Sequence, residues 1–257
     1  MKVDRLLAPN PGLFTGPGTN TWVMTSQGES VIIDPGPVIE SHLEAIKEAA
    51  SGTAIRAILV THAHPDHAPA ANGLAVEFGV PAVGSAPGPD FSPDWTIADG
   101  EKVGFGSLAA VCVATPGHTP DSVCYRIRNS LLTGDHIMGG STVVVDGMSD
   151  YLESLRKLHN TGLERLYPGH GPVIDSPDRT IAEYISHRLE RERQILDALG
   201  RGARSLGAIV LDVYADVDPA LHPLAAMSVA AHLQKLSIDG RVDVQAEPKW
   251  ESEVRLR

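Results

Sequence analysis

A histidine-rich stretch of seven residues constrains this chain more than any other feature. Residues 61–67 are Thr-His-Ala-His-Pro-Asp-His. They follow an apolar, β-branched run over residues 55–60, which predicts a buried strand, and they precede residues 68–78, which predict a helix. The histidines therefore belong to a loop at the carboxyl end of a strand, where we expect their side chains to converge on one point.

The donor atoms of this loop predict a site for two metal ions. Imidazole nitrogens and carboxylate oxygens suit zinc or another borderline divalent metal. Three histidines and one aspartate within seven residues supply more donors than the three that a catalytic tetrahedral zinc site takes from the protein. The alternative is a histidine-rich surface loop without a ligand, and further motifs along the chain argue against it.

Three shorter motifs accompany the histidine-rich loop. Residues 115–119 are Thr-Pro-Gly-His-Thr, residues 133–135 are Thr-Gly-Asp, and residues 167–171 are Tyr-Pro-Gly-His-Gly. Each follows a short apolar run and lies at a predicted turn. Together with residues 61–67, the motifs occur in the order typical of the metallo-β-lactamase superfamily, and the chain resembles that superfamily.

The resemblance implies a ligand set and a reaction. One zinc ion would be held by His62, His64 and His118, a second by Asp66, His67 and His170, with Asp135 bridging both. A hydroxide between the ions would be the nucleophile of a hydrolytic reaction, because metal binding lowers the pKa of water from 15.7 toward roughly 7. Asp66 and Asp135 are the expected catalytic carboxylates, with Asp66 as a shuttle that carries a proton to the leaving atom. A site of this composition could also take iron or manganese.

The order of the predicted elements indicates an α/β domain. Residues 22–24 and 31–34 form a predicted hairpin and residues 38–50 a predicted amphipathic helix, and strands then alternate with helices. The resemblance implies a four-layer αββα sandwich of two mixed sheets, with the metals at one edge. It also places Asp34 beneath the metals, where its carboxylate would accept the second ring N–H of a liganding histidine. Turn chemistry in Asp-Pro-Gly is an equally good explanation of Asp34.

The pattern changes after residue 178. Apolar residues from 181 to 199 mark a long amphipathic helix, and residues 206–214, 224–236 and 238–244 then suggest two helices and a β-wing. We therefore expect a catalytic domain over residues 1–178 and a connecting helix with a winged-helix-like domain over residues 179–257. Residues 184–188, Tyr-Ile-Ser-His-Arg, and residues 248–250, Pro-Lys-Trp, narrow the resemblance to the mammalian β-lactamase-like protein 2 group. Residues 180–257 carry 10 Lys and Arg against 12 Asp and Glu, a net charge of 10 − 12 = −2, which favours a structural cover or a dimer surface over DNA reading.

Composition limits the classes of function further. The net charge of −11 and an aromatic content of 5% argue against a dedicated nucleic-acid binder. No segment resembles a membrane span, and the first residues lack the apolar core of a signal peptide, so a cytoplasmic location is expected. Cys112 and Cys124 lie in strand-like runs and are expected to be buried free thiols.

Three functions are consistent with the sequence. The favoured one is hydrolysis of a small ester, thioester or lactone, and the second is cleavage of single-stranded RNA, an activity of the mammalian group that the chain resembles. The third, a non-catalytic binding protein, would require lost ligands, and all seven ligand positions are present. A homo-oligomer is compatible with all three. Substrate choice would depend on rim segments such as residues 87–93 and 139–150, whose composition selects no substrate.

Overall fold

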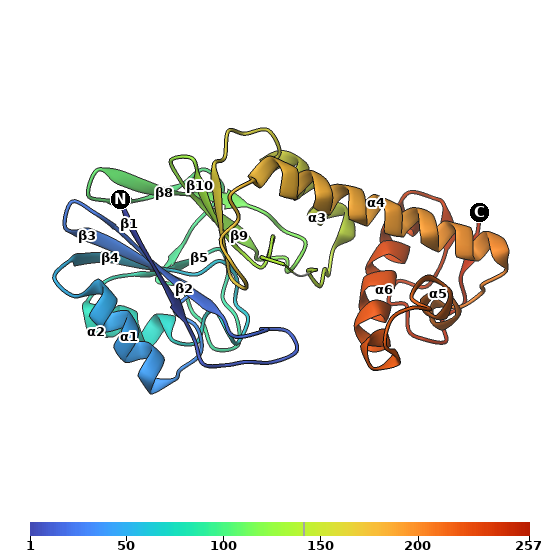
Figure 1. The fold of residues 1–257 in the computed structure, drawn as a ribbon, viewed down its shortest axis with the longest axis horizontal. Coiled ribbons are helices and arrows are strands. Elements are labelled where there is room, and N and C mark those ends of the chain that lie inside the picture. Colours follow the sequence, from blue (N-terminus) through green and yellow to red (C-terminus); the bar gives the residue numbers. More distant parts are fainter. Residues whose placement is uncertain (141) are drawn as a thin grey trace. The chain divides into compact units, whose positions relative to one another are not determined.

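The computed structural model describes residues 1–140 and 142–257, and it divides into two compact units (Figure 1). Residues 1–116, 121–143 and 160–178 form the first unit, and residues 117–120, 144–159 and 179–257 form the second. Ser141, in the expected rim segment 139–150, lies outside the described residues.

The first unit contains a six-stranded mixed sheet. Its strands follow the chain order: β1 (Lys2–Leu7), β2 (Asn20–Ser26), β3 (Glu29–Ile33), β4 (Ala54–Leu59), β5 (Ala82–Gly84) and β6 (Trp95–Thr96). The first three strands pair antiparallel, and β3 to β6 pair parallel. Gln27 and Gly28 join β2 to β3 with φ of 51° and 79°, the left-handed backbone of tight hairpin turns, so the predicted hairpin is confirmed.

A five-stranded mixed sheet completes the framework of the first unit. Its strand order is β11-β10-β9-β8-β7, and only β10 and β11 are parallel. The bounds are β7 (Lys102–Phe105), β8 (Leu108–Ala114), β9 (Val123–Ile127), β10 (Ser130–Gly134) and β11 (Arg165–Pro168).

The two sheets enclose the main core. Alternation along β2 explains how one strand serves two interfaces, because successive side chains point to opposite faces. Trp22 and Met24 pack between the sheets with Tyr125 and Phe105, whereas Val23 packs on the opposite face. That opposite face is covered by the helices α1 (Glu40–Ala50) and α2 (Ala71–Phe78) (Figure 1). Both cysteines are buried and neither forms a disulfide bond, as expected.

The second unit is mostly helical. Its elements are α3 (Met148–Leu158), α4 (Pro177–Arg201, which begins at the end of the first unit), α5 (Leu206–Val213), the 3-10 helix η1 (Pro219–Leu221), α6 (His222–Ile238) and the antiparallel pair β12 (Val242–Asp243) and β13 (Arg255–Leu256). Side chains of α4, α5 and α6 share one apolar core, which includes Leu199, Ile209 and Leu233. None of the helices in the described part of the chain combines the length and apolar character needed to cross a membrane.

The structure shifts some predicted boundaries. The helix expected from residue 68 begins at Ala71, because residues 65–70 form turns that shape the histidine-rich loop. The wing expected over residues 238–244 contains only Val242 and Asp243 as a strand, since Ile238 still belongs to α6. Its partner strand is β13, near the end of the chain. The domain boundary after residue 178 stays a prediction.

Candidate metal centre

The motif residues lie just beyond the carboxyl ends of strands. The histidine-rich loop follows β4, the segment of His118 follows β8, Asp135 follows β10 directly, and His170 lies two residues beyond β11. Because β10 and β11 are parallel neighbours, their carboxyl ends bring Asp135 and His170 to the same edge of the sheet.

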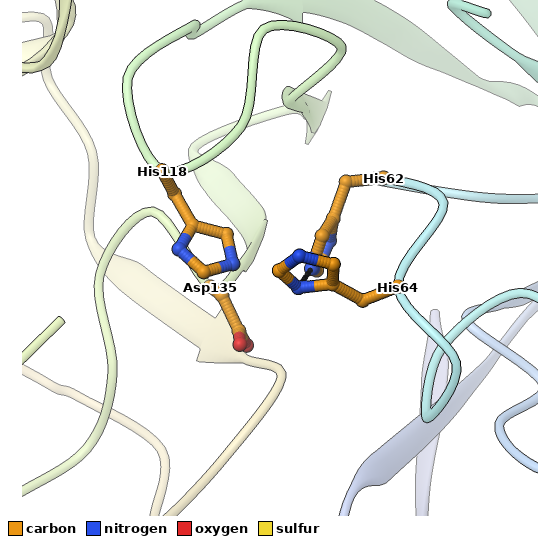
Figure 2. A group of neighbouring side chains, drawn as sticks. All are labelled: His62, His64, His118 and Asp135. Carbon is orange, nitrogen blue, oxygen red and sulfur yellow. Dashed lines mark hydrogen bonds between the residues drawn. The ribbon is translucent and has the colours of Figure 1, made fainter. Parts of the chain in front are cut away.

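The seven predicted residues form two groups of donor atoms. His62, His64, His118 and Asp135 each offer one donor atom, and these atoms lie within 4.8 Å of one another (Figure 2). Asp66, His67 and His170 form a second group by the same criterion. Within the groups, His62 Nε2 lies 3.0 Å from His64 Nδ1, and His67 Nε2 lies 3.4 Å from His170 Nε2.

The carboxylate of Asp135 reaches both groups. It belongs to the first group, yet its Oδ1 lies 3.4 Å from His67 Nε2 and its Oδ2 lies 3.4 Å from His170 Nε2, both in the second. An anion between two cation sites reduces the repulsion of ions about 3.5–4 Å apart. The carboxylate of Asp135 is therefore shared by the two donor groups.

Several ring nitrogens that face away from the donor clusters have partners of their own. His67 Nδ1 lies 3.0 Å from Asp34 Oδ2, and His170 Nδ1 lies 3.2 Å from the Gly18 carbonyl oxygen. His118 Nδ1 lies 2.7 Å from the carbonyl oxygen of Val144. Such contacts hold each imidazole in one tautomer and one orientation, as the outer partners of metal ligands do.

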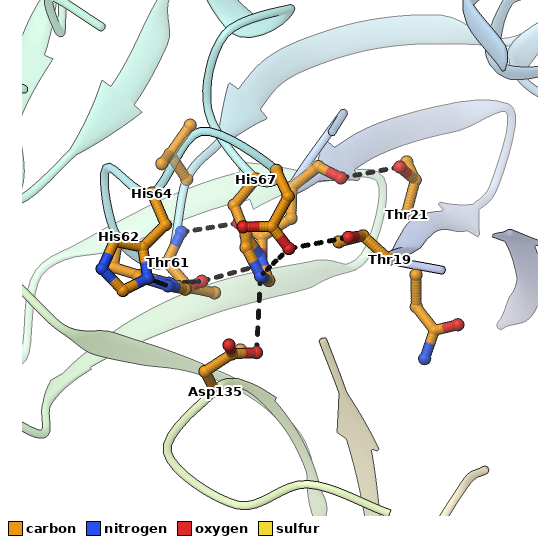
Figure 3. Close-up of polar contacts among 12 residues, drawn as sticks. Thr19, Thr21, Thr61, His62, His64, His67 and Asp135 are labelled. Carbon is orange, nitrogen blue, oxygen red and sulfur yellow. Dashed lines mark hydrogen bonds and ion pairs between the residues drawn. The ribbon is translucent and has the colours of Figure 1, made fainter. Parts of the chain in front are cut away.

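Asp34 holds the first residue of the histidine-rich loop, Thr61, as well as His67. Its carboxylate accepts from the backbone N–H of Thr61 at 2.8 Å and from the Thr61 hydroxyl at 2.7 Å (Figure 3). Its backbone has φ of 50°, a left-handed conformation that costs energy for a residue with a side chain. The expected contact with a histidine is thus present, together with two further hydrogen bonds.

Two glycines make room for the donor groups. A Cβ on Gly169 would lie 2.6 Å from both Asp135 Oδ1 and His67 Cε1. Gly134 has φ of 49°, and a Cβ there would lie 2.3 Å from Thr61 Oγ1. The glycines of the two motifs therefore allow the backbone to approach side chains that a larger residue would displace.

The electrostatics of the second group indicate an excess of negative charge. Burial opposes a charged imidazole at His67, but the carboxylates of Asp135, Asp66 and Asp34 raise its pKa well above the usual value. At His170 burial acts in the same opposing direction, and hydrogen bonds to Asp135 and Asp66 raise the pKa to about 9. Burial would raise the pKa of Asp66, yet His67, His170 and Thr19 lower it below its usual range. Protons on the histidines balance charge that a metal cation would balance instead.

The donor set fits divalent metal ions. Histidine nitrogens converge at hydrogen-bond distance in both groups, carboxylate oxygens lie beside them, and all these residues except His64 and Asp66 are buried. Neutral imidazole and carboxylate are the ligands that zinc and similar ions accept.

Residues outside the motifs also shape the centre, and sequence reasoning missed them. The Asp121 carboxylate accepts from the backbone N–H of Ala63, between two donor histidines, at 2.8 Å, and Ser85 Oγ donates to the Asp121 carbonyl oxygen. Thr19 donates to Asp66 Oδ2 at 2.8 Å. In the sequence, the only indication of Thr19, Ser85 and Asp121 is their position beside predicted turns. Six other histidines lie outside both donor groups: His42, His136, His159, His187, His222 and His232.

Comparison with known families agrees with this architecture. The family model of the metallo-beta-lactamase superfamily matches residues 14–170, and that of the beta-lactamase associated winged helix domain matches residues 205–250. The chain therefore belongs to the metallo-β-lactamase superfamily and is a metal-dependent hydrolase. The predicted fold class, including the C-terminal winged helix, is confirmed.

Individual relatives cover most of the chain. It is 34% identical over 253 residues to a beta-lactamase-like protein 2 homolog of Caenorhabditis elegans, a match that covers 94% of this chain and 86% of that protein. It is 34% identical over 232 residues to an atrochrysone carboxyl ACP thioesterase of Aspergillus chevalieri, covering 84% and 74%. A solved structure of a metallo-beta-lactamase family protein from Thermus thermophilus has a TM-score of 0.81 at 19% identity, covering 99% of this chain and 98% of that one, and shares the fold.

Proposed function

We propose that this chain is a binuclear zinc-dependent hydrolase of a small ester, thioester or lactone. The observation that carries the proposal is the pair of converging donor groups that the Asp135 carboxylate joins. The proposed ligands are His62, His64 and His118 for one ion, Asp66, His67 and His170 for the other, and Asp135 for both. Iron or manganese would suit the same donors.

The carboxylates of the site would have separate roles in hydrolysis. Bound divalent ions would polarise the electrophile and lower the pKa of water so that a nucleophile exists at neutral pH. Asp66 has a side chain that is 23% exposed, against 9% for Asp135 and 2% for Asp34. Asp66 is therefore the carboxylate best placed to meet a substrate and to carry a proton to its leaving atom. Asp135 would be a ligand of both ions, and Asp34 would hold His67 in place.

Two observations support a small acyl substrate. The relative from Aspergillus chevalieri is named as a thioesterase, and the chain shares 34% of its residues with it over the matched length. The chain also carries a net charge of −11, which opposes general attraction of nucleic acid.

Cleavage of single-stranded RNA is the second candidate. The similarity to the beta-lactamase-like protein 2 homolog of Caenorhabditis elegans favours it, because the mammalian group of that name, which the sequence resembles, has this activity.

We further propose that the protein is cytoplasmic, that its two domains cover residues 1–178 and 179–257, and that it could form a homo-oligomer.

The test is paired turnover on zinc-loaded protein. A panel of acyl thioesters, esters and lactones is assayed beside a labelled single-stranded RNA, with Asp135→Ala as the control for contaminating enzymes. Elemental analysis of the same preparation counts the metal ions per chain. Thioester or ester cleavage that disappears in the control, with intact RNA and two ions per chain, is the expected result.

Other outcomes would redirect the proposal. RNA cleavage that disappears in Asp135→Ala would establish the second candidate instead. One ion per chain in a fully active preparation would contradict the binuclear assignment, whichever substrate is cleaved.

A further inference from the structure

Thr19 touches the candidate centre from outside the histidine motifs. It immediately precedes β2, its side chain is fully buried, and its Oγ1 lies 2.8 Å from Asp66 Oδ2 (Figure 3). The same carboxylate oxygen lies 3.2 Å from His170 Nε2 and 3.4 Å from His67 Nε2. The Thr19 hydroxyl therefore contacts the oxygen of Asp66 that faces the other two donors of its group.

The direction of each hydrogen bond in this contact is fixed by a neighbour. The backbone N–H of Thr19 can only donate, and it donates to Asn10 Oδ1 at 3.0 Å. The other end of the Asn10 amide is consequently the NH₂ group, which donates to Thr19 Oγ1 at 3.0 Å. With its oxygen accepting from Asn10, the Thr19 hydroxyl directs its proton to Asp66.

The backbone of Thr19 is held by hydrogen bonds that do not involve its hydroxyl. Its N–H bonds to the Asn10 side chain, and its carbonyl oxygen accepts the N–H of Ala8 at 2.9 Å. Asn20, the next residue, donates its N–H to the Gly169 carbonyl oxygen at 2.7 Å. Removing only the hydroxyl should thus leave the backbone in place and take away the hydrogen bond that Asp66 accepts from Thr19.

We propose that Thr19, held by Asn10, is a positioning residue that sets the affinity of the Asp66, His67 and His170 group for its metal ion. The proposal rests on the binuclear assignment above. Asp66 is the most exposed side chain of the group, so its rotamer needs a restraint that buried His67 and His170 receive from packing. A donor aimed at the ligating oxygen supplies that restraint, and loss of such an outer partner typically costs 10- to 100-fold in metal affinity.

Three variants separate this role from a general structural one. Thr19→Val keeps the shape of the side chain and removes the donor, whereas Thr19→Ser keeps the donor. Thr15→Val is the matched control, since Thr15 lies in the same loop and its hydroxyl donates to the Asn10 carbonyl oxygen rather than to the centre. Zinc affinity at each site is measured by competition with a chromogenic chelator, with thermal unfolding as the check on folding.

The expected result is two zinc ions in every variant at saturation, with the affinity for one of them reduced by about 10- to 100-fold in Thr19→Val alone. Recovery in Thr19→Ser would support the hydroxyl as the cause. Equal affinities for both ions in Thr19→Val and in the unchanged protein would overturn the inference and leave the proposed function standing. A single zinc site in the unchanged protein would overturn both proposals. An equal loss in Thr15→Val would overturn the positioning role, because it would assign the effect to the loop.

Discussion

His67 and His232 are equally buried and stand in opposite surroundings. Both side chains are 0% exposed. Three carboxylates face His67: Asp34 Oδ2 at 3.0 Å from Nδ1, and Asp66 Oδ2 and Asp135 Oδ1 at 3.4 Å from Nε2. His232, in α6, has no hydrogen-bond partner at either ring nitrogen within the described residues. The charged groups that lower its pKa most are the basic residues Arg188, Lys235, Arg191 and His187.

The neighbouring charges decide which protonation state each buried imidazole favours. Burial favours the neutral form of both rings, but the carboxylates around His67 reverse that preference and raise its pKa. At His232 burial and the basic neighbours act together and lower the pKa to about 3. The surroundings of His67 suit a cation, whereas His232 is a neutral side chain packed among helices. A count of histidines would treat the two alike.

Removing the shared carboxylate should have the largest effect. Asp135→Ala takes away the carboxylate that reaches both donor groups. We expect hydrolytic kcat/KM to fall by more than the roughly 100-fold that marks the upper range for outer partners of metal ligands. Steady-state kinetics and metal analysis of the same sample measure it. Activity within a few-fold of the unchanged protein would place the chemistry elsewhere.

Asp66→Asn tests whether the exposed carboxylate moves a proton. Loss of a general acid or base typically lowers kcat by about 10²- to 10⁴-fold, so we expect a fall of roughly 100-fold in kcat. The assay is run at zinc saturation, with the metal content measured, because Asp66 is also a proposed ligand. An unchanged kcat with full zinc content would remove the proton-shuttle role and leave ligation alone.

Asp34→Asn weakens the negative surroundings of His67 from the side away from the other carboxylates. The amide keeps the shape but loses the charge and one acceptor among the three contacts that Asp34 makes with Thr61 and His67. We expect a loss of about 10-fold in zinc affinity. A chelator competition measures it, and His232→Leu serves as a comparison in which zinc affinity should stay constant. Equal affinity in Asp34→Asn would show that charge around His67 is unimportant for the metal.

Sequence reasoning succeeded for site residues that belong to short contiguous motifs. The seven predicted residues lie in four such motifs, each next to an apolar strand, and the structure brings all of them together. It failed for partners separated along the chain, since Thr19 and Asp66 are 47 residues apart and Ala63 and Asp121 are 58 apart. Strands of two residues such as β6, β12 and β13 are too short to show alternation. Burial and long-range pairing decide those features, and neither has a local pattern.

The last prediction concerns the sensitivity to acid that His232 confers on the fold. Its folded-state pKa of about 3 lies below the ordinary 6.5, so unfolding takes up a proton between these values. Its contribution to stability is therefore complete above pH 6.5 and is lost as pH falls from 6.5 toward 3, at roughly 1.4 kcal/mol per pH unit. Between roughly pH 6.5 and pH 5, the free energy of unfolding of His232→Leu should therefore fall by about 2 kcal/mol less than that of the unchanged protein. Urea unfolding across this range measures it, with His222→Gln in the same helix as the control. Parallel pH profiles for His232→Leu and the unchanged protein would mean that folding leaves the pKa of this ring unchanged, and the contrast with His67 would fail.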